Sequence, residues 1–313
     1  MTPEQTFFAA FAGLVVLFAT ATALGTWLER RTGDAVKLVW IAHLNARIRA
    51  SWSIALLFAV AFALGDNALA VIFAVASFFA LREFIALTPI RASDHNALVL
   101  AFYVVIPVQY LLVASESYAM FAVFIPVYVF LVLPVVTALG RDTERYLERV
   151  AKVQWGLMIS VFCVSHAPAI ASLQLPGYED RGALLLLWFL LVVQLSELLA
   201  VLASASFGRT PLESDHDKSR EGVLLGAVAA TLVGMGLWWM TPFSWWQALF
   251  IAGATVGAGC LGGLVLAAIR RGFGARLWVD EGVELSRGVL ERLAALSFAA
   301  PVFFHLTLYF FAA

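Results

Sequence analysis

The feature that most constrains this chain is a series of apolar blocks, each about as long as a lipid bilayer is thick. A membrane-spanning helix needs about 17 to 25 such residues. Ten blocks meet or approach that length: 7–28, 52–66, 68–81, 97–114, 118–139, 153–172, 183–205, 222–241, 244–268 and 293–311. Two of them are short, but Gly65, Asp66 and Asn67 between them are typical of a turn, so we expect a tight hairpin. The chain therefore predicts an all-α, polytopic membrane bundle of about ten transmembrane helices.

The composition supports a membrane protein and excludes several other classes. Of the 313 residues, 62% are hydrophobic and only 13% are charged, against roughly 25% charged in soluble proteins. A net charge of -1 argues against a nucleic-acid partner. Cys163 and Cys260 lie inside apolar blocks without a ligand at metal-binding spacing, so we interpret both as core residues.

The distribution of Lys and Arg predicts which side of the membrane each loop faces. Basic residues gather in alternate loops, and only Arg181 lies on the other side. By the positive-inside rule, the basic loops face the cytoplasm and both termini lie on the outer side. We expect a multi-pass protein of the cell inner (cytoplasmic) membrane. We expect the following loops on the cytoplasmic side: 29–51, 82–96, 140–152, 206–221 and 269–292.

The same pattern suggests three parts along the chain. Residues 1–51 are expected to form an N-terminal anchor helix and a basic loop, and the acidic Glu4 argues against a cleaved signal peptide. Residues 52–172 are expected to form the N-terminal transmembrane helices. Residues 173–313 are expected to form a C-terminal core with two charged cytoplasmic loops, at 206–221 and 269–292.

An acid inside the seventh apolar block is the first candidate for function. Glu197 lies about 12 Å below the cytoplasmic end of the block, at 1.5 Å per residue. Gln194, Glu197 and Ser204 share one helical face, which must point into the bundle or a wet cavity. An acid inside the membrane indicates a functional site by default, whereas the plainer interpretation is a protonated side chain that is hydrogen-bonded to a neighbouring helix.

The two charged loops mix arginines with carboxylates close to glycines. Such sets can hold phosphates and a divalent metal. Ordinary positive-inside loops look similar, so spacing alone leaves both interpretations open.

Several segments of this chain resemble phosphatidate cytidylyltransferases (CDP-diacylglycerol synthases). FFALREFIALTP at 78–89 is similar to the family's early segment, and VVQLSELL at 192–199 is similar to its span ending in an acid, with Glu197 in the acid's place. FGR at 207–209 and the sequence around Lys218 and Glu221 resemble its F-G-[KR] and S-P-x-K-T-x-E-G motifs. The resemblance covers most of the chain after about residue 50.

The family's final motif is degenerate here. Leu277 and Ala294 stand where two aspartates belong, and Gly262 and Gly263 replace an upstream Gly-Asp pair. Glu291 takes the place of the first acid of D-R-x-D, followed by Arg292.

The resemblance implies transfer of CMP from CTP to a phosphatidate-like lipid, with Mg²⁺ or Mn²⁺ as cofactor and the bilayer as the setting. It leaves the oligomeric state open, a homodimer included. The candidate site residues that follow from it fall into three groups. The catalytic group is Lys218, Glu221, Arg271 and Arg292; the substrate-binding group is Arg209, Ser219, Arg220 and Arg270; and the metal-binding group is Glu197, Asp280 and Glu291.

The missing aspartates favour a second hypothesis, a catalytically impaired relative. Such a protein would bind lipid or nucleotide, or partner an active membrane enzyme. The retained Lys218, Glu221 and Glu291 favour the enzyme. A transporter or another lipid transferase on the same helices is a third alternative.

Overall fold

The structure is a computed structural model of the chain. It describes residues 3–31, 65–87, 91–140, 142–212, 215–272 and 288–311, together with isolated positions between 41 and 60. The side chains of a few residues inside these ranges are not described.

Helices account for nearly all of the described chain. They are α1 (Pro3–Arg31), α3 (Asp66–Ala86), α4 (His95–Leu100), α5 (Ile106–Ala114), α6 (Tyr118–Val123), α7 (Phe130–Ala138), α8 (Tyr146–Leu157), α9 (Cys163–Ala171), α10 (Gly182–Phe207), α11 (Arg220–Gly236), α12 (Trp245–Gly272) and α13 (Val289–Phe311). The π-helical turns Ala101–Val105, Phe124–Val129 and Met158–Phe162 join α4 to α5, α6 to α7 and α8 to α9.

The described helices confirm the predicted class of fold. Within the described ranges, eight continuous helical stretches are long and apolar enough to cross a membrane. In addition, α11, of 17 residues, packs between α10 and α12. The only described strands are the short antiparallel pair β1 (Pro211–Leu212) and β2 (Asp215–Ser219), a hairpin inside the predicted loop 206–221. The predicted span 52–66 lies almost wholly outside the described residues.

The hairpin predicted at Gly65, Asp66 and Asn67 lies partly outside the described residues. Asp66 and Asn67 are the first residues of a helix that is longer than expected. Gly65 has a φ of 92°, which favours glycine, and α3 begins at Asp66. The helix runs to Ala86 instead of ending at 81, and so includes the charged residues Arg82 and Glu83. The apolar block ends at these charged residues, so the sequence predicted the end of the helix there. The helix nevertheless continues through them for several residues.

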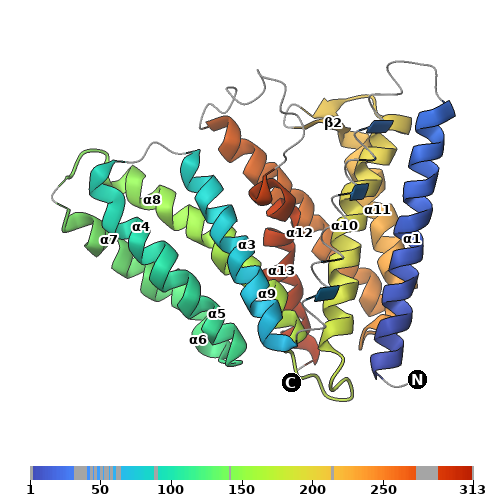
Figure 1. The fold of residues 1–313 in the computed structure, drawn as a ribbon, viewed down its shortest axis with the longest axis horizontal. Coiled ribbons are helices and arrows are strands. Elements are labelled where there is room, and N and C mark those ends of the chain that lie inside the picture. The colour runs from blue at the N-terminus through green and yellow to red at the C-terminus, as the bar shows by residue number, and fades with distance from the viewer. Residues whose placement is uncertain are drawn as a thin grey trace.

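The helices run side by side, with α1 at one edge of the bundle and α4 to α7 at the other (Figure 1). The N-terminal end of α1 and the C-terminal end of α13 lie at the same end of the bundle (Figure 1). The opposite end carries β2, the last residues of α10 and α12, and the first residues of α11. We call it the hairpin end.

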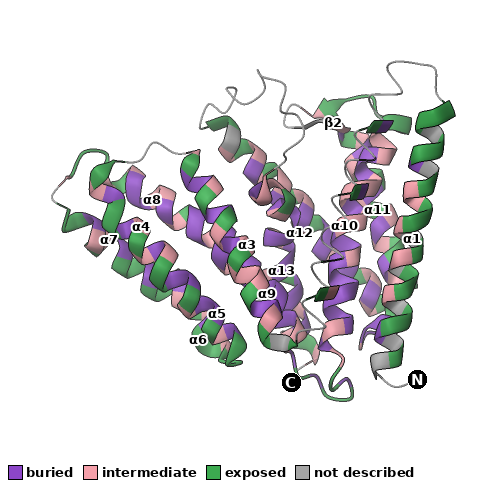
Figure 2. Ribbon diagram, in the orientation of Figure 1, coloured by how far each residue is buried: buried purple, intermediate pink, exposed green. Residues whose placement is uncertain are grey.

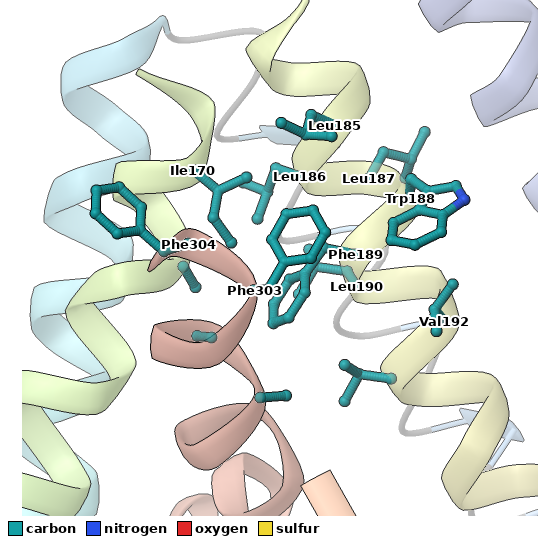
Figure 3. Packing of buried hydrophobic residues seen from close by; sticks show 14 of the residues in the cluster. Ile170, Leu185, Leu186, Leu187, Trp188, Phe189, Leu190, Val192, Phe303 and Phe304 are labelled. Atoms are coloured by element: carbon teal, nitrogen blue, oxygen red, sulfur yellow. The ribbon is translucent and has the colours of Figure 1, made fainter. Parts of the chain in front are cut away.

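The core lies where α9, α10 and α13 meet. Figure 3 shows Phe303 of α13 directed at α10, beside Phe189 and Leu190, and Phe304 of α13 on the other side, beside Ile170 of α9. The ring of Phe303 lies 5.1 Å from that of Phe189 and 5.7 Å from that of Trp188. By contrast, exposed apolar residues cover the outer faces of the edge helices (Figure 2). A bundle that is packed inside and apolar outside is typical of a protein surrounded by lipid.

A buried ion pair fixes α8 to the segment before α4. Arg149 Nη2 lies 2.6 Å from Asp94 Oδ1, and the two side chains are 5% and 8% exposed. Arg149 also donates to Ser93 Oγ and to the carbonyl oxygens of Asp142 and Glu144. This arginine is fully engaged in holding the helices together.

Candidate functional site

The predicted acid and lysine meet at the hairpin end. Lys218, one residue before the end of β2, places Nζ 2.6 Å from Oε2 of Glu197 on α10. The side chain of Lys218 is 14% exposed and that of Glu197 is 32% exposed. The attraction between the two charges therefore offsets much of the desolvation penalty of each. The β hairpin positions this cation, because it turns the chain back over the end of α10.

Ser219 is the N-cap residue of α11 and fixes the position of that helix on α10. Its Oγ accepts a hydrogen bond from the N–H of Gly222 at 3.0 Å, the usual role of a serine N-cap. Its own N–H donates to Ser204 Oγ at 2.8 Å. Gly222 has to lack a side chain, because a Cβ there would lie 2.0 Å from Ser204 Oγ. The Ser-x-x-Gly spacing therefore holds Lys218 just before the first turn of α11.

Glu221 organises the loop between α10 and the hairpin. Its carboxylate accepts from Thr210 Oγ1 at 2.6 Å and from the backbone N–H groups of Thr210 and Arg209 at 3.1 and 3.2 Å. Hydrogen bonds from Thr210 lower the pKa of Glu221 to about 2. Its oxygens are thus directed at the loop backbone, and the catalytic role implied by the resemblance stays a prediction.

One face of α12 is directed at the Lys218–Glu197 ion pair. Cys260 lies within electrostatic range of both Glu197 and Lys218. Gly263, Ala267 and Arg271 follow Cys260 at helical spacing on the same face. A Cβ on Gly263 would meet nothing within 4 Å, so this part of the face is open. Arg271 lies exposed near the end of the helix, and its Nε donates to the carbonyl of Ala267.

The remnants of the final motif lie in the first turn of α13. Glu291 is half-buried and Arg292 is exposed. Ala294, at the position of a family aspartate, is 8% exposed, and its carbonyl oxygen lies 2.7 Å from where a Cβ on Gly262 would be. The two helices, α12 and α13, are therefore in close contact at the position where the resemblance implies acids.

Sequence reasoning missed Glu83 at this place. Its Oε2 accepts a hydrogen bond from the backbone N–H of Leu290 at 3.0 Å, across 207 residues of sequence. Glu83 lies in segment 78–89, which resembles the family, and this could have marked the residue as a candidate. The sequence did not indicate that its partner is Leu290.

The described residues bring together only part of the predicted site. Arg209 and Arg220 lie exposed beside the hairpin, and the N–H of Arg220 donates to the carbonyl of Thr210. Asp280 and Leu277 lie outside the described residues, as does the side chain of Arg270. Among the described residues, no three His, Cys, Asp or Glu side chains converge as a metal centre would require. The acids present there do not, by themselves, fit a preformed magnesium site.

Fold and site together define an integral membrane helical bundle with a cationic site at one end. Residues 45–310 match the profile of the Cytidylyltransferase family. The chain belongs to that family.

Three relatives are similar over much of their length. The uncharacterised protein YnbB of Escherichia coli (strain K12) is 30% identical over 96% of this chain and 98% of its own. The phosphatidate cytidylyltransferase of Helicobacter pylori (strain ATCC 700392 / 26695) is 30% identical over 67% of this chain and 84% of its own. Its counterpart in strain J99 / ATCC 700824 is 28% identical over 58% of this chain and 72% of its own.

Proposed function

We propose that this protein transfers CMP from CTP to a phosphatidate-type lipid, giving a CDP-lipid and pyrophosphate in phospholipid biosynthesis. The observation that carries the proposal is the Lys218–Glu197 pair in front of α11, in a chain of the cytidylyltransferase family. The ammonium is preformed and close to a helix N-terminus, where anions are favoured. A glutamate holds it, and an incoming phosphate can compete for it.

In the proposed reaction, an oxygen of the lipid phosphate attacks the α-phosphorus of CTP. A new P–O bond forms there as the bond to the β-phosphate oxygen breaks, and pyrophosphate leaves with the bonding electrons. Such transfers depend on alignment and on neutralising the leaving group rather than on covalent help from the protein. Lys218 and Arg271 are the cations we assign to the nucleotide phosphates, with Arg209, Arg220 and Arg292 around them.

We further propose that Mg²⁺ or Mn²⁺ reaches the site with the nucleotide. Mg²⁺ is commonly held by one or two carboxylates together with substrate phosphates and water, which suits a chain whose described acids do not converge. Glu291 and Glu197 are the acids that would hold it, with Asp280, outside the described residues, in place of the aspartate that Leu277 replaces. The metal would neutralise charge on the phosphates.

The proposed setting is the inner membrane, with the hairpin end toward the cytoplasm. CTP is soluble and would arrive from that side, while the lipid would arrive through the bilayer. The clustering of Lys and Arg in the loops of this end supports the orientation.

The test is pyrophosphate release by purified protein supplied with CTP, phosphatidic acid and Mg²⁺. Lys218→Ala should lower turnover at least about tenfold, since hydrogen bonds between charged groups are among the strong ones. Lys152→Ala is a matched control, because Lys152 is 15% exposed and lies 2.7 Å from Glu148. Equal losses in both variants, or no release by the unmodified protein, would contradict the proposal.

The second candidate function is binding without catalysis. The buried Ala294 and the dispersed acids favour it. Titration calorimetry with CTP and Mg²⁺ separates the two: affinity that depends on Lys218, in a protein releasing no pyrophosphate, would identify the non-catalytic binder.

A further inference from the structure

Glu83 connects two helices that are far apart in sequence at the point where α13 begins. Its carboxylate is bound to the N–H of Leu290, the second residue of α13. The residue before the helix is Gly288, and a Cβ there would lie 1.9 Å from Oε1 of Glu83. The carboxylate therefore occupies the space that a side chain at 288 would need.

The first N–H groups of any helix lack partners within that helix. Most helices satisfy them with a Ser, Thr, Asp or Asn at the N-cap. Gly288 has no side chain to offer, so here the acceptor comes from α3. A negative charge also interacts favourably with the positive end of the helix dipole. A local cap would stabilise α13 alone, whereas a cap from α3 also fixes where α13 begins relative to α3.

The placement of that first turn matters because Glu291 and Arg292 lie in it. A shift of α13 by one residue would turn both side chains by about 100° around the helix axis. Ala294 in the next turn is packed closely against Gly262 of α12, so such a shift would also rearrange the contact between α12 and α13.

We propose that Glu83 is a positioning residue for the site: it caps α13 from a distance and thereby sets the positions of Glu291 and Arg292. The inference deepens the proposed function and rests on it for its catalytic consequence. The cap itself can be tested without turnover.

The first measurement is hydrogen exchange of the amides in the first turn of α13, in purified full-length protein. Glu83→Ala should raise exchange at Leu290 and its neighbours by about tenfold, because a charged acceptor is lost. Glu83→Gln keeps a carbonyl acceptor and should have a smaller effect. Glu179→Ala is the matched control, since Glu179 also accepts a backbone N–H, that of Gly177 at 2.8 Å, in the loop at the other end. Unchanged exchange in Glu83→Ala would overturn the proposal.

The second measurement is turnover, with kcat and KM separated. Glu83→Ala should lower kcat by tenfold or more, because misplacement by about an ångström is costly, and Glu83→Gln should recover part of it. Altered exchange with unchanged kcat would overturn the positioning role. If the unmodified protein shows no turnover, the proposed function fails, while the exchange result still decides whether the cap exists.

A double variant provides a test that does not depend on Glu83→Ala being well folded. Gly288→Ala should disturb the first turn because its methyl group meets the carboxylate. Adding Glu83→Ala removes that clash, so the double variant should exchange no faster than the worse single variant. Additive effects of the two substitutions would contradict direct contact.

Discussion

At the scale of single residues, two ion pairs of similar chemistry have different surroundings. Arg149 and Asp94 are 5% and 8% exposed and are closed in by further hydrogen bonds. Lys218 and Glu197, at 14% and 32%, remain accessible. An incoming phosphate can compete with a carboxylate only where it can reach the cation. Accessibility therefore distinguishes the candidate site from the Arg149–Asp94 pair. The Lys152–Glu148 pair is similarly exposed, and what distinguishes Lys218–Glu197 from it is the place of Lys218 just before the first turn of α11.

Glu221 gives a prediction for the pH dependence of stability. Its pKa in the folded protein is about 2, below the usual 4.5 for glutamate. Its stabilising contribution is therefore fully present above pH 4.5 and is lost as the pH falls toward 2. We expect the difference in melting temperature between the protein and Glu221→Gln to be largest above pH 4.5 and to shrink on acidification. A difference that stays constant down to pH 2.5 would contradict this assignment.

Gly263 gives a prediction about restoring an acid. Gly263→Asp places a carboxylate in open space on the face of α12 that includes Cys260 and Arg271. We expect it to fold and to bind CTP with Mg²⁺ more tightly than the unmodified protein. Gly257→Asp, also in open space and exposed but turned by about 120° from Gly263 around α12, serves as the control and should not raise affinity. Calorimetry decides, and equal affinities of both variants would refute the prediction.

Ala294→Asp should behave differently from Gly263→Asp. Ala294 is 8% exposed in the contact between α12 and α13, so a carboxylate there would be buried without a described partner. We expect destabilisation by about 3 kcal/mol, measured by unfolding in detergent. A stable variant would indicate that this helix contact opens readily.

At the scale of elements, the contact between α10 and α11 depends on small residues four apart. Gly222, Gly226, Ala230 and Gly234 are all buried along one face of α11. A Cβ on Gly226 would lie 2.3 Å from the backbone nitrogen of Ala200, and backbone cannot move aside as a flexible side chain can. Such rows are typical of closely packed membrane helices. The row fixes α11, and with it Ser219 and Lys218, on α10.

Gly226→Ala should consequently be destabilising. We expect a loss of about 1 to 3 kcal/mol from overpacking, measured by unfolding in detergent. Gly236→Ala, at the end of the same helix, has nothing within 4 Å of the added methyl and should be neutral or slightly stabilising. Equal effects of the two substitutions would show that the small-residue row does not govern this contact.

Of the three described π-helical turns, one contains a proline and another ends two residues before one. Pro126 lies inside Phe124–Val129, and Pro107 follows Ala101–Val105 after one residue. Proline lacks the N–H that a regular turn uses, so the helix adjusts locally. The third turn, Met158–Phe162, has no such neighbour, and the structure offers no physical account of it.

At the scale of the whole molecule, the charge asymmetry predicts orientation. Single cysteines replace Gly140, in a predicted cytoplasmic loop, and Glu179, in the loop at the other end, in a background without Cys163 and Cys260. We expect an impermeant thiol reagent to label the cysteine at 179, but not the one at 140, in intact cells. The reverse pattern would invert the orientation, and equal labelling would reject the span assignment.

The sequence by itself determined the class of fold. A bilayer requires apolar stretches of a fixed length, and such stretches can be recognised in a sequence without knowing any tertiary contact. It also indicated Lys218 and Glu197, through an acid inside the membrane and a local motif. Only the tertiary structure decided that these two residues pair, that Glu221 is directed to the loop backbone and that Ala294 is buried. It alone revealed Glu83 at the start of α13, 207 residues away. Periodicity and motifs report local environment, whereas partners across the bundle depend on how the helices pack.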